Sequence, residues 1–157
     1  MNLELVEILW KYSMFPAAKL PNIANQELQK GFYGPATAEI AGMSKPSEDD
    51  IGDLFERSIS EIKKDFLADE DMPVFIAKAL VDKELEPWDG IYILSKLYEE
   101  LNCPQDLKIF RFLFEEYTEY IPPKYLPHLK ENPLIPVFKH NCHKDIIRAA
   151  AEYLKGK

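Results

Sequence analysis

Residues 47–66 read SEDDIGDLFERSISEIKKDF and carry the clearest helical pattern in the chain. Apolar side chains recur here mostly every three or four residues, at Ile51, Leu54, Phe55, Ile59, Ile62 and Phe66. This spacing places them on one face of an α-helix. Ser47 precedes Asp50 by three residues, which is the spacing of a capping box at a helix N-terminus. The stretch therefore predicts a single amphipathic helix with one continuous apolar stripe.

The same helical spacing recurs along the rest of the chain. Only four valines and two threonines are present, and alternation of polar and apolar residues is hard to find, so β-strands are not expected. Further helices are expected over about residues 3–14, 20–30, 36–41, 73–83, 87–101, 106–120 and 142–155. The sequence thus predicts an all-α fold, a single-domain bundle of about seven to eight helices over residues 1–157.

Two of these helices are expected to be well buried. The first is apolar on more than one side, and the helix over residues 106–120 has its apolar seam widened by Ile109, Phe112 and Leu113. The latter helix is therefore expected at the centre of the fold.

Residues 121–136 contain five prolines together with several large apolar residues, and this composition predicts an ordered, extended loop before the last helix.

Glycines mark the turn that follows the helix over residues 20–30. Gly31 stands where a helix commonly ends in the left-handed conformation. Gly31 and Gly34 enclose two aromatic residues but lack the lysine and the preceding strand of a phosphate-binding loop. The sequence predicts a tight turn between helices, with Phe32 and Tyr33 tucked in.

Length and composition narrow the class of protein. A chain of 157 residues suits one compact domain, and no segment approaches the roughly 20 apolar residues that cross a bilayer. The start Met1-Asn2-Leu3-Glu4 does not resemble a signal peptide, and two distant cysteines form no disulfide framework. We expect a cytoplasmic protein without a membrane partner. A net charge of −8 argues against direct binding of nucleic acid.

Negative charge is concentrated in one part of the sequence. Residues 48–71 hold ten acids against three bases, which accounts for seven of the eight net negative charges. Such a concentration raises the local potential and speeds encounter with a basic partner. The interpretation that competes with it is a solvated helix face. The residues predicted to bind the partner are Asp49, Asp50, Asp53, Glu56, Asp69, Glu70 and Asp71.

Two sets of residues resemble a known group of proteins. The first is Leu20-Pro21, Ile23-Ala24, Leu28, Gly31, Ile40-Ala41-Gly42-Met43, Ile51 and Leu54-Phe55, and the second is Leu85-x-Pro87-x-x-Gly90. Together they resemble a diffuse group of small helical bacterial proteins of uncharacterised function, which includes immunity-type proteins of toxin–immunity systems. The resemblance covers about two-thirds of the chain and transfers no catalytic residue. It implies a role in binding a protein partner.

The histidines and cysteines are candidates for a metal site or a nucleophilic pair, but their spacing supports neither. His140, Cys142 and His143 lie close together, with His128 upstream, but their spacing does not match a zinc site. Cys142 and His143 are adjacent, so on a helix their side chains diverge and do not form a nucleophilic pair. We therefore predict no catalytic residue, no metal and no cofactor.

The sequence as a whole favours a non-enzymatic, acidic protein-binding module. Its most concrete form is an immunity or antitoxin-like inhibitor that neutralises a basic toxin partner, such as a nuclease. A helical enzyme that uses carboxylates or a metal in a cleft is one alternative. An oligomeric scaffold protein is another, and the sequence does not establish the oligomeric state.

Overall fold

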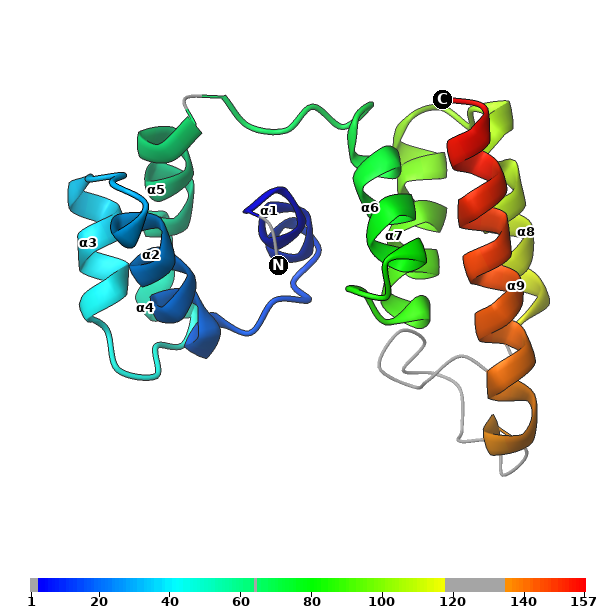
Figure 1. Cartoon of the computed structure of the whole chain (residues 1–157), viewed down its shortest axis with the longest axis horizontal. Helices are drawn as coiled ribbons and strands as arrows, with labels where there is room; N and C mark the ends of the chain where they lie inside the picture. Colours follow the sequence, from blue (N-terminus) through cyan, green and yellow to red (C-terminus); the bar gives the residue numbers. More distant parts are fainter. Residues whose placement is uncertain (1–2, 64, 118–134) are drawn as a thin grey trace. The chain divides into compact units, whose positions relative to one another are not determined.

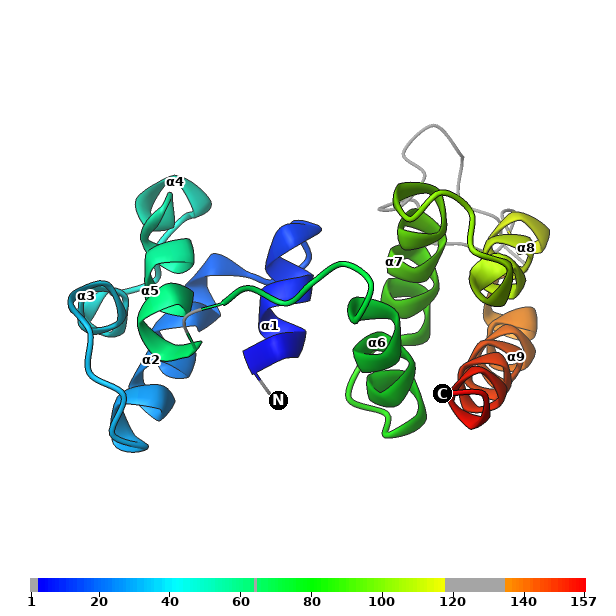
Figure 2. The same cartoon turned by 90° about the horizontal axis from the view of Figure 1, so that it is seen from above.

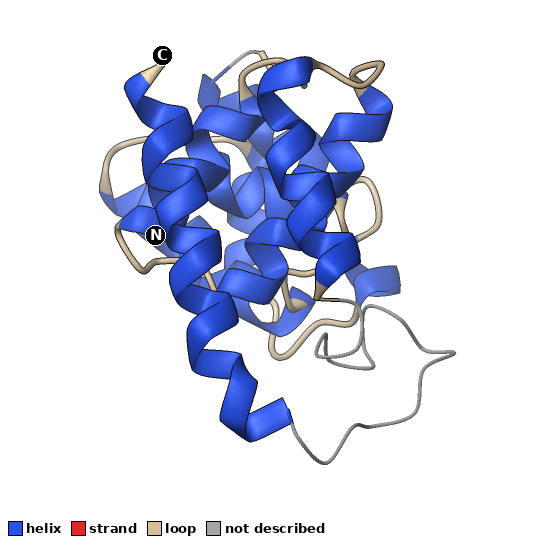
Figure 3. Cartoon of the chain, turned by 90° about the vertical axis from the view of Figure 1, so that its right-hand side faces the viewer, coloured by secondary structure: helices blue, strands red, loops and turns tan. Residues whose placement is uncertain are grey.

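A computed structural model of the chain describes residues 3–63, 65–117 and 135–157, with side chains described from residue 141 onward in the last range. Helices and the loops that join them make up these ranges, and no strand occurs in them (Figure 3). The all-α prediction is confirmed. The chain forms two compact units, residues 1–68 and 69–157, which we call unit 1 and unit 2. The predicted single domain stays a prediction.

Unit 1 is built from five α-helices and a short 3₁₀ turn within its described residues (Figure 1). They are α1 Leu3–Lys11, η1 Ala17–Lys19, α2 Leu20–Gln29, α3 Pro35–Gly42, α4 Glu48–Ile51 and α5 Leu54–Lys63. Helix α3 packs against both α2 and α5. Five consecutive residues of α1, from Leu5 to Leu9, are buried, which confirms that this helix is covered on more than one side.

The helix predicted over residues 47–66 is interrupted at Gly52. The capping box at Ser47 starts α4 as predicted, but Gly52 ends it with φ 47° and ψ −126°, a conformation that suits glycine. The new helix α5 begins at Leu54. Ile51 and Leu54 are both buried, so the apolar stripe continues across the break. The spacing of apolar residues therefore does not reveal that the helix is interrupted. Phe66 lies beyond the end of α5 and is exposed, so it is not part of the stripe.

The turn between α2 and α3 follows the prediction for its backbone only. Gly31 adopts φ 95°, its N–H donates to Leu28 O, and the Phe32 N–H donates to Glu27 O. This pair of bonds is the Schellman motif. The expectation that the two aromatic side chains are tucked in is wrong: Phe32 is 42 % exposed and Tyr33 is 85 % exposed. The backbone hydrogen bonds of Gly31 and Phe32 hold the turn.

Unit 2 contains four α-helices and a short 3₁₀ turn in the part of the chain that is described, seen from above in Figure 2. They are α6 Met72–Val81, α7 Pro87–Glu100, η2 Gln105–Leu107, α8 Lys108–Glu116 and α9 Ile135–Lys155. Helix α6 packs against α7 and α9, and α7 packs against α8. The core of this unit includes Trp88 and Phe110, both almost completely buried.

Two predictions for unit 2 need correction. The helix expected at the centre is shorter, and Ile109 and Phe112 are exposed while Phe110 and Leu113 are buried, so α8 covers the core from outside. The last helix starts at Ile135 and not near Cys142. Proline is tolerated in the first turn of a helix, so Pro136 does not prevent the earlier start. Most of the predicted proline-rich loop lies outside the described residues.

Candidate functional site

Four of the predicted partner-binding residues lie together in unit 1. Asp49 and Asp50 are on α4, Asp53 lies in the break between the helices, and Glu56 is in the first turn of α5. We call these four residues the α4–α5 acidic cluster. All four are exposed, and the apolar side chains Ile51, Leu54 and Phe55 between them are buried. The core therefore fixes the helices whose outer face carries the carboxylates.

Local hydrogen bonds order the first part of the cluster. The Asp50 carboxylate accepts from the Ser47 N–H at 2.8 Å and from the Ser47 hydroxyl at 2.7 Å, while the Asp50 N–H donates to Ser47 Oγ at 3.2 Å. Hydrogen bonds from the side chain and then the backbone of Ser47 lower the pKa of Asp50 against a smaller opposing effect of burial. Asp50 is consequently a fixed negative charge at neutral pH.

The bases of the described residues form no ion pair with three members of the cluster. Among the described residues, no ion pair reaches Asp49, Asp53 or Glu56. The charge of nearby Arg57 acts on Glu61, which lies one turn further along α5. Within the same residues, no three acids, histidines or cysteines gather as metal ligands would. The arrangement presents negative charge outward and does not focus it on one point.

The other three predicted residues begin unit 2. Glu70 and Asp71 are exposed and Asp69 is half-buried. Backbone carbonyls of Asp69 and Asp71 accept from Met72 N at 3.3 Å and Val74 N at 3.2 Å, which forms the turn into α6. Acids at this position interact favourably with the positive end of the helix dipole. The predicted site is thus divided between the two units, with four residues in one and three in the other.

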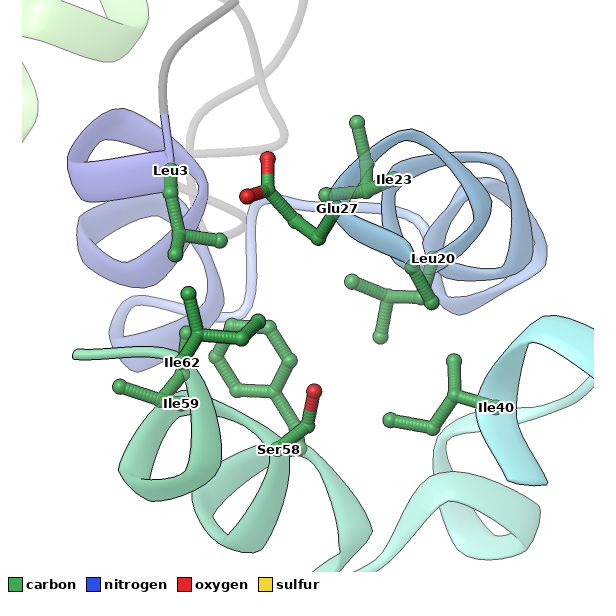
Figure 4. Close-up of a pocket in the computed structure, with 10 residues that line it drawn as sticks. Leu3, Leu20, Ile23, Glu27, Ile40, Ser58, Ile59 and Ile62 are labelled. Carbon is green, nitrogen blue, oxygen red and sulfur yellow. The ribbon is translucent and has the colours of Figure 1, made fainter. Parts of the chain in front are cut away.

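Two acids of unit 1 are buried, and the sequence pattern alone did not single them out. Glu7 is 6 % exposed and Glu27 is 5 % exposed. Lys63 forms an ion pair with Glu7, and the Lys30 ammonium lies 2.6 Å from Glu27. The sequence contains a sign that both acids are buried. Glu7 interrupts the apolar run Leu5-Val6-Glu7-Ile8-Leu9, and Glu27 falls on the apolar face of α2. Glu27 also lines a small cavity in unit 1, of about 10 Å³, which has room for about one water (Figure 4). The other residues around this cavity are apolar, except Ser58.

A third acid, Glu61, joins α5 to α3. Its carboxylate accepts from Ala36 N and Thr37 N at 2.9 Å each, and from Thr37 Oγ1 at 2.9 Å. These are free donors of the first turn of α3, so Glu61 caps that helix from another element. Burial acts to raise the pKa of Glu61, but these hydrogen bonds and the charge of Arg57 together hold it below its usual value. The partners are 24 and 25 residues away in sequence, and no local pattern predicts this contact.

The Cys142–His143 candidate has the surroundings of a packed core. Cys142 is 3 % exposed, and burial, followed by the nearby Asp145 carboxylate, raises the pKa of its thiol. A buried thiol with a raised pKa is a poor nucleophile. His143 Nε2 lies 3.4 Å from Glu86 Oε1, and its ring meets Trp88 edge-on at 5.3 Å between centroids. His128 and the side chain of His140 lie outside the described part of the chain.

No family model, curated protein or solved structure matches the chain. Across the described ranges, no helix is both long enough and apolar enough to pass through a bilayer.

Proposed function

We propose that this chain is a non-enzymatic protein-binding module that presents the α4–α5 acidic cluster to a basic protein partner. Its most concrete form is a cytoplasmic immunity or antitoxin-like inhibitor of a basic toxin. The observation that carries the proposal is the set of exposed carboxylates in the cluster, of which Asp49, Asp53 and Glu56 have no ion pair among the described residues. Exposed, unpaired charge of one sign is available to a partner of the opposite sign.

The type of partner follows from the charge and exposure of these groups. A nuclease binds phosphates in a groove lined with lysine and arginine, because neutralising phosphate charge supplies most of its affinity for nucleic acid. Carboxylates fixed on two short helices can enter such a groove in place of phosphates. Long-range attraction then accelerates encounter, while a few buried contacts determine how long the complex lasts. In unit 2, Glu70 and Asp71 supply further exposed negative charge.

The proposal is tested by the salt dependence of association. The purified chain is mixed with the protein encoded immediately upstream of it, and the association rate constant is measured by stopped flow between about 0.05 and 0.5 M salt. We expect the rate constant to fall at least about tenfold over this range. The triple variant Asp49→Asn, Asp53→Asn and Glu56→Gln is expected to associate slowly at low salt and to lose most of the salt dependence.

A matched variant separates local from overall charge. Glu39→Gln, Asp82→Asn and Glu84→Gln remove the same number of exposed negative charges elsewhere in the chain. This variant is expected to keep most of the association rate, because the α4–α5 acidic cluster itself is left intact. Association that is insensitive to salt, or equal losses in both triple variants, would rule out the α4–α5 acidic cluster as the docking surface.

A further inference from the structure

A buried carboxylate in unit 1 holds the chain that leaves this unit. Glu7 lies in the middle of α1, and its Oε1 accepts a hydrogen bond from the N–H of Leu67 at 2.7 Å. Its Oε2 forms an ion pair with the ammonium group of Lys63, the last residue of α5. We propose that Glu7 is a latch that fastens the segment after α5 to unit 1 and so limits the length of free chain before unit 2.

The energetics favour a latch that is either fully closed or fully open. A carboxylate taken out of water is strongly destabilising unless it is both paired and hydrogen-bonded. Glu7 is 6 % exposed, and the Lys63 side chain is 20 % exposed, so both charges are largely removed from solvent. Loss of either contact leaves a buried charge without a full set of partners. The bond to Leu67 and the pair with Lys63 are therefore expected to break together.

Release of the latch would change the reach of the chain between the acidic groups of the two units. With Leu67 held, five residue steps separate it from Met72 at the start of α6, a span of at most about 18 Å. With Leu67 free, nine steps separate Lys63 from Met72, or at most about 32 Å. Tether length sets the effective concentration of a second binding group. This consequence for a partner rests on the proposed function, but the latch itself does not.

Hydrogen exchange measured by NMR tests the latch without any partner. In the native chain, the Leu67 amide is expected to exchange at least about tenfold more slowly than in an unstructured peptide, although residues 65–68 form no helix. Glu7→Ala and Lys63→Met are both expected to remove this protection, because the two contacts are expected to break together. Glu39→Gln, which changes an exposed acid of α3 in the same unit, is expected to leave it unchanged.

Two readouts keep the test decisive. The amide of Ile59, a fully buried residue of α5, reports whether unit 1 is still folded in each variant. Exposed Phe66 offers a chymotrypsin site in the segment, and its cleavage should accelerate when Leu67 loses protection. Unprotected Leu67 in the native chain overturns the latch, even if Glu7→Ala does not fold. Unchanged Leu67 exchange in a folded Glu7→Ala variant overturns it as well. Unchanged partner association in the Asp49, Asp53 and Glu56 variant, with Leu67 still protected, counts against the proposed function alone.

Discussion

Carboxylates of unit 1 have two distinct environments at the scale of single residues. Glu7, Glu27 and Glu61 have partners within the unit, and two of these partners are lysines at helix ends. Asp49 and Asp53, by contrast, are exposed and have no ion pair in the described ranges. The same side-chain chemistry therefore fastens helices together in one place and remains available to a partner in another.

The cap that Glu61 provides for α3 has a pH dependence with a defined sign. Its pKa is lower in the folded chain than in the unfolded one, so the unfolded state binds more protons between the two values and stability rises with pH there. The stabilisation is complete above the unfolded pKa, near pH 4–5, and is lost as pH falls through the folded pKa. We expect Glu61→Gln to lower the free energy of unfolding by about 0.5–2 kcal/mol at pH 7 and by less at pH 3.

Chemical denaturation at the two pH values checks this expectation. Glu39→Gln is the control, because Glu39 is an exposed acid on α3, the helix that Glu61 caps. Gly34 leaves the space that Glu61 occupies, since a Cβ atom at this position would overlap the Glu61 carboxylate. A loss of stability in Glu61→Gln that is the same at pH 3 and pH 7 would mean that the ionised carboxylate is not what stabilises α3.

Some of these residue-scale features are predictable from sequence and others are not. The bond between Ser47 and Asp50 is predictable because capping depends on a spacing of three residues along the chain. A buried role for Glu7 is also predictable in principle, since an acid inside an apolar run has to be covered when its neighbours are. The Glu61 cap depends on the packing of α5 against α3. Its residues are too far apart in sequence for any local rule to connect them.

At the scale of helices, the sequence identifies the elements well and the breaks between them poorly. The start of α7 at Pro87 and the end of α2 before Gly31 follow from the conformations that these two residues favour. Gly52 does not interrupt the apolar stripe, so the pattern cannot reveal it. The sequence also predicts the wrong depth for Ile109 and Phe112 of α8, for a related reason. Apolar residues are common on protein surfaces, so Ile109 and Phe112 indicate a helix without indicating its depth.

The break at Gly52 gives a prediction in which the two interpretations differ in sign. In a continuous helix, Gly52→Ala would stabilise the fold by about 1 kcal/mol. In the structure, Gly52 has φ 47° and ψ −126°, where a Cβ atom is strained whatever space surrounds it. We therefore expect Gly52→Ala to lower the free energy of unfolding by about 1–3 kcal/mol, measured by urea denaturation.

Another glycine provides the matched control for this measurement. Gly42 is the last residue of α3, its φ is not positive, and a Cβ atom there would meet nothing within 4 Å. Gly42→Ala is expected to be neutral or slightly stabilising. A gain in stability from Gly52→Ala of the size seen at Gly42 would support an unbroken helix over residues 48–63.

For the whole molecule, the sequence predicts where charge is concentrated but not how the fold divides it. Residues 48–71 appear as one acidic stretch because charge is counted along the chain. The boundary between the two units falls at residue 68, inside this stretch. Asp53 and Asp71 therefore belong to different units, although 18 positions separate them in sequence. Division into units depends on contacts between helices, which composition and periodicity do not specify.

The two tryptophans report separately on the two units. Trp10 of unit 1 has its ring centroid 5.2 Å from that of Phe55, and Trp88 of unit 2 is 1 % exposed. A variant that keeps one tryptophan, with phenylalanine at the other position, assigns the fluorescence change to one unit. Completely buried side chains occur in both units, including Ile59 in unit 1 and Ile91 in unit 2. We therefore expect the urea transitions seen by Trp10 and by Trp88 to have different midpoints.

Matched core substitutions, one in each unit, test whether the two units unfold independently. Ile59→Val and Ile91→Val each remove one methylene group from a fully buried side chain, which costs about 0.5–1.5 kcal/mol. Ile59→Val is expected to lower the midpoint at Trp10 by about 0.5–1 M urea and to leave the midpoint at Trp88 unchanged, with the reverse for Ile91→Val. If either substitution moves both transitions together, the units unfold as one, and the single domain predicted from the sequence is the correct description of this chain.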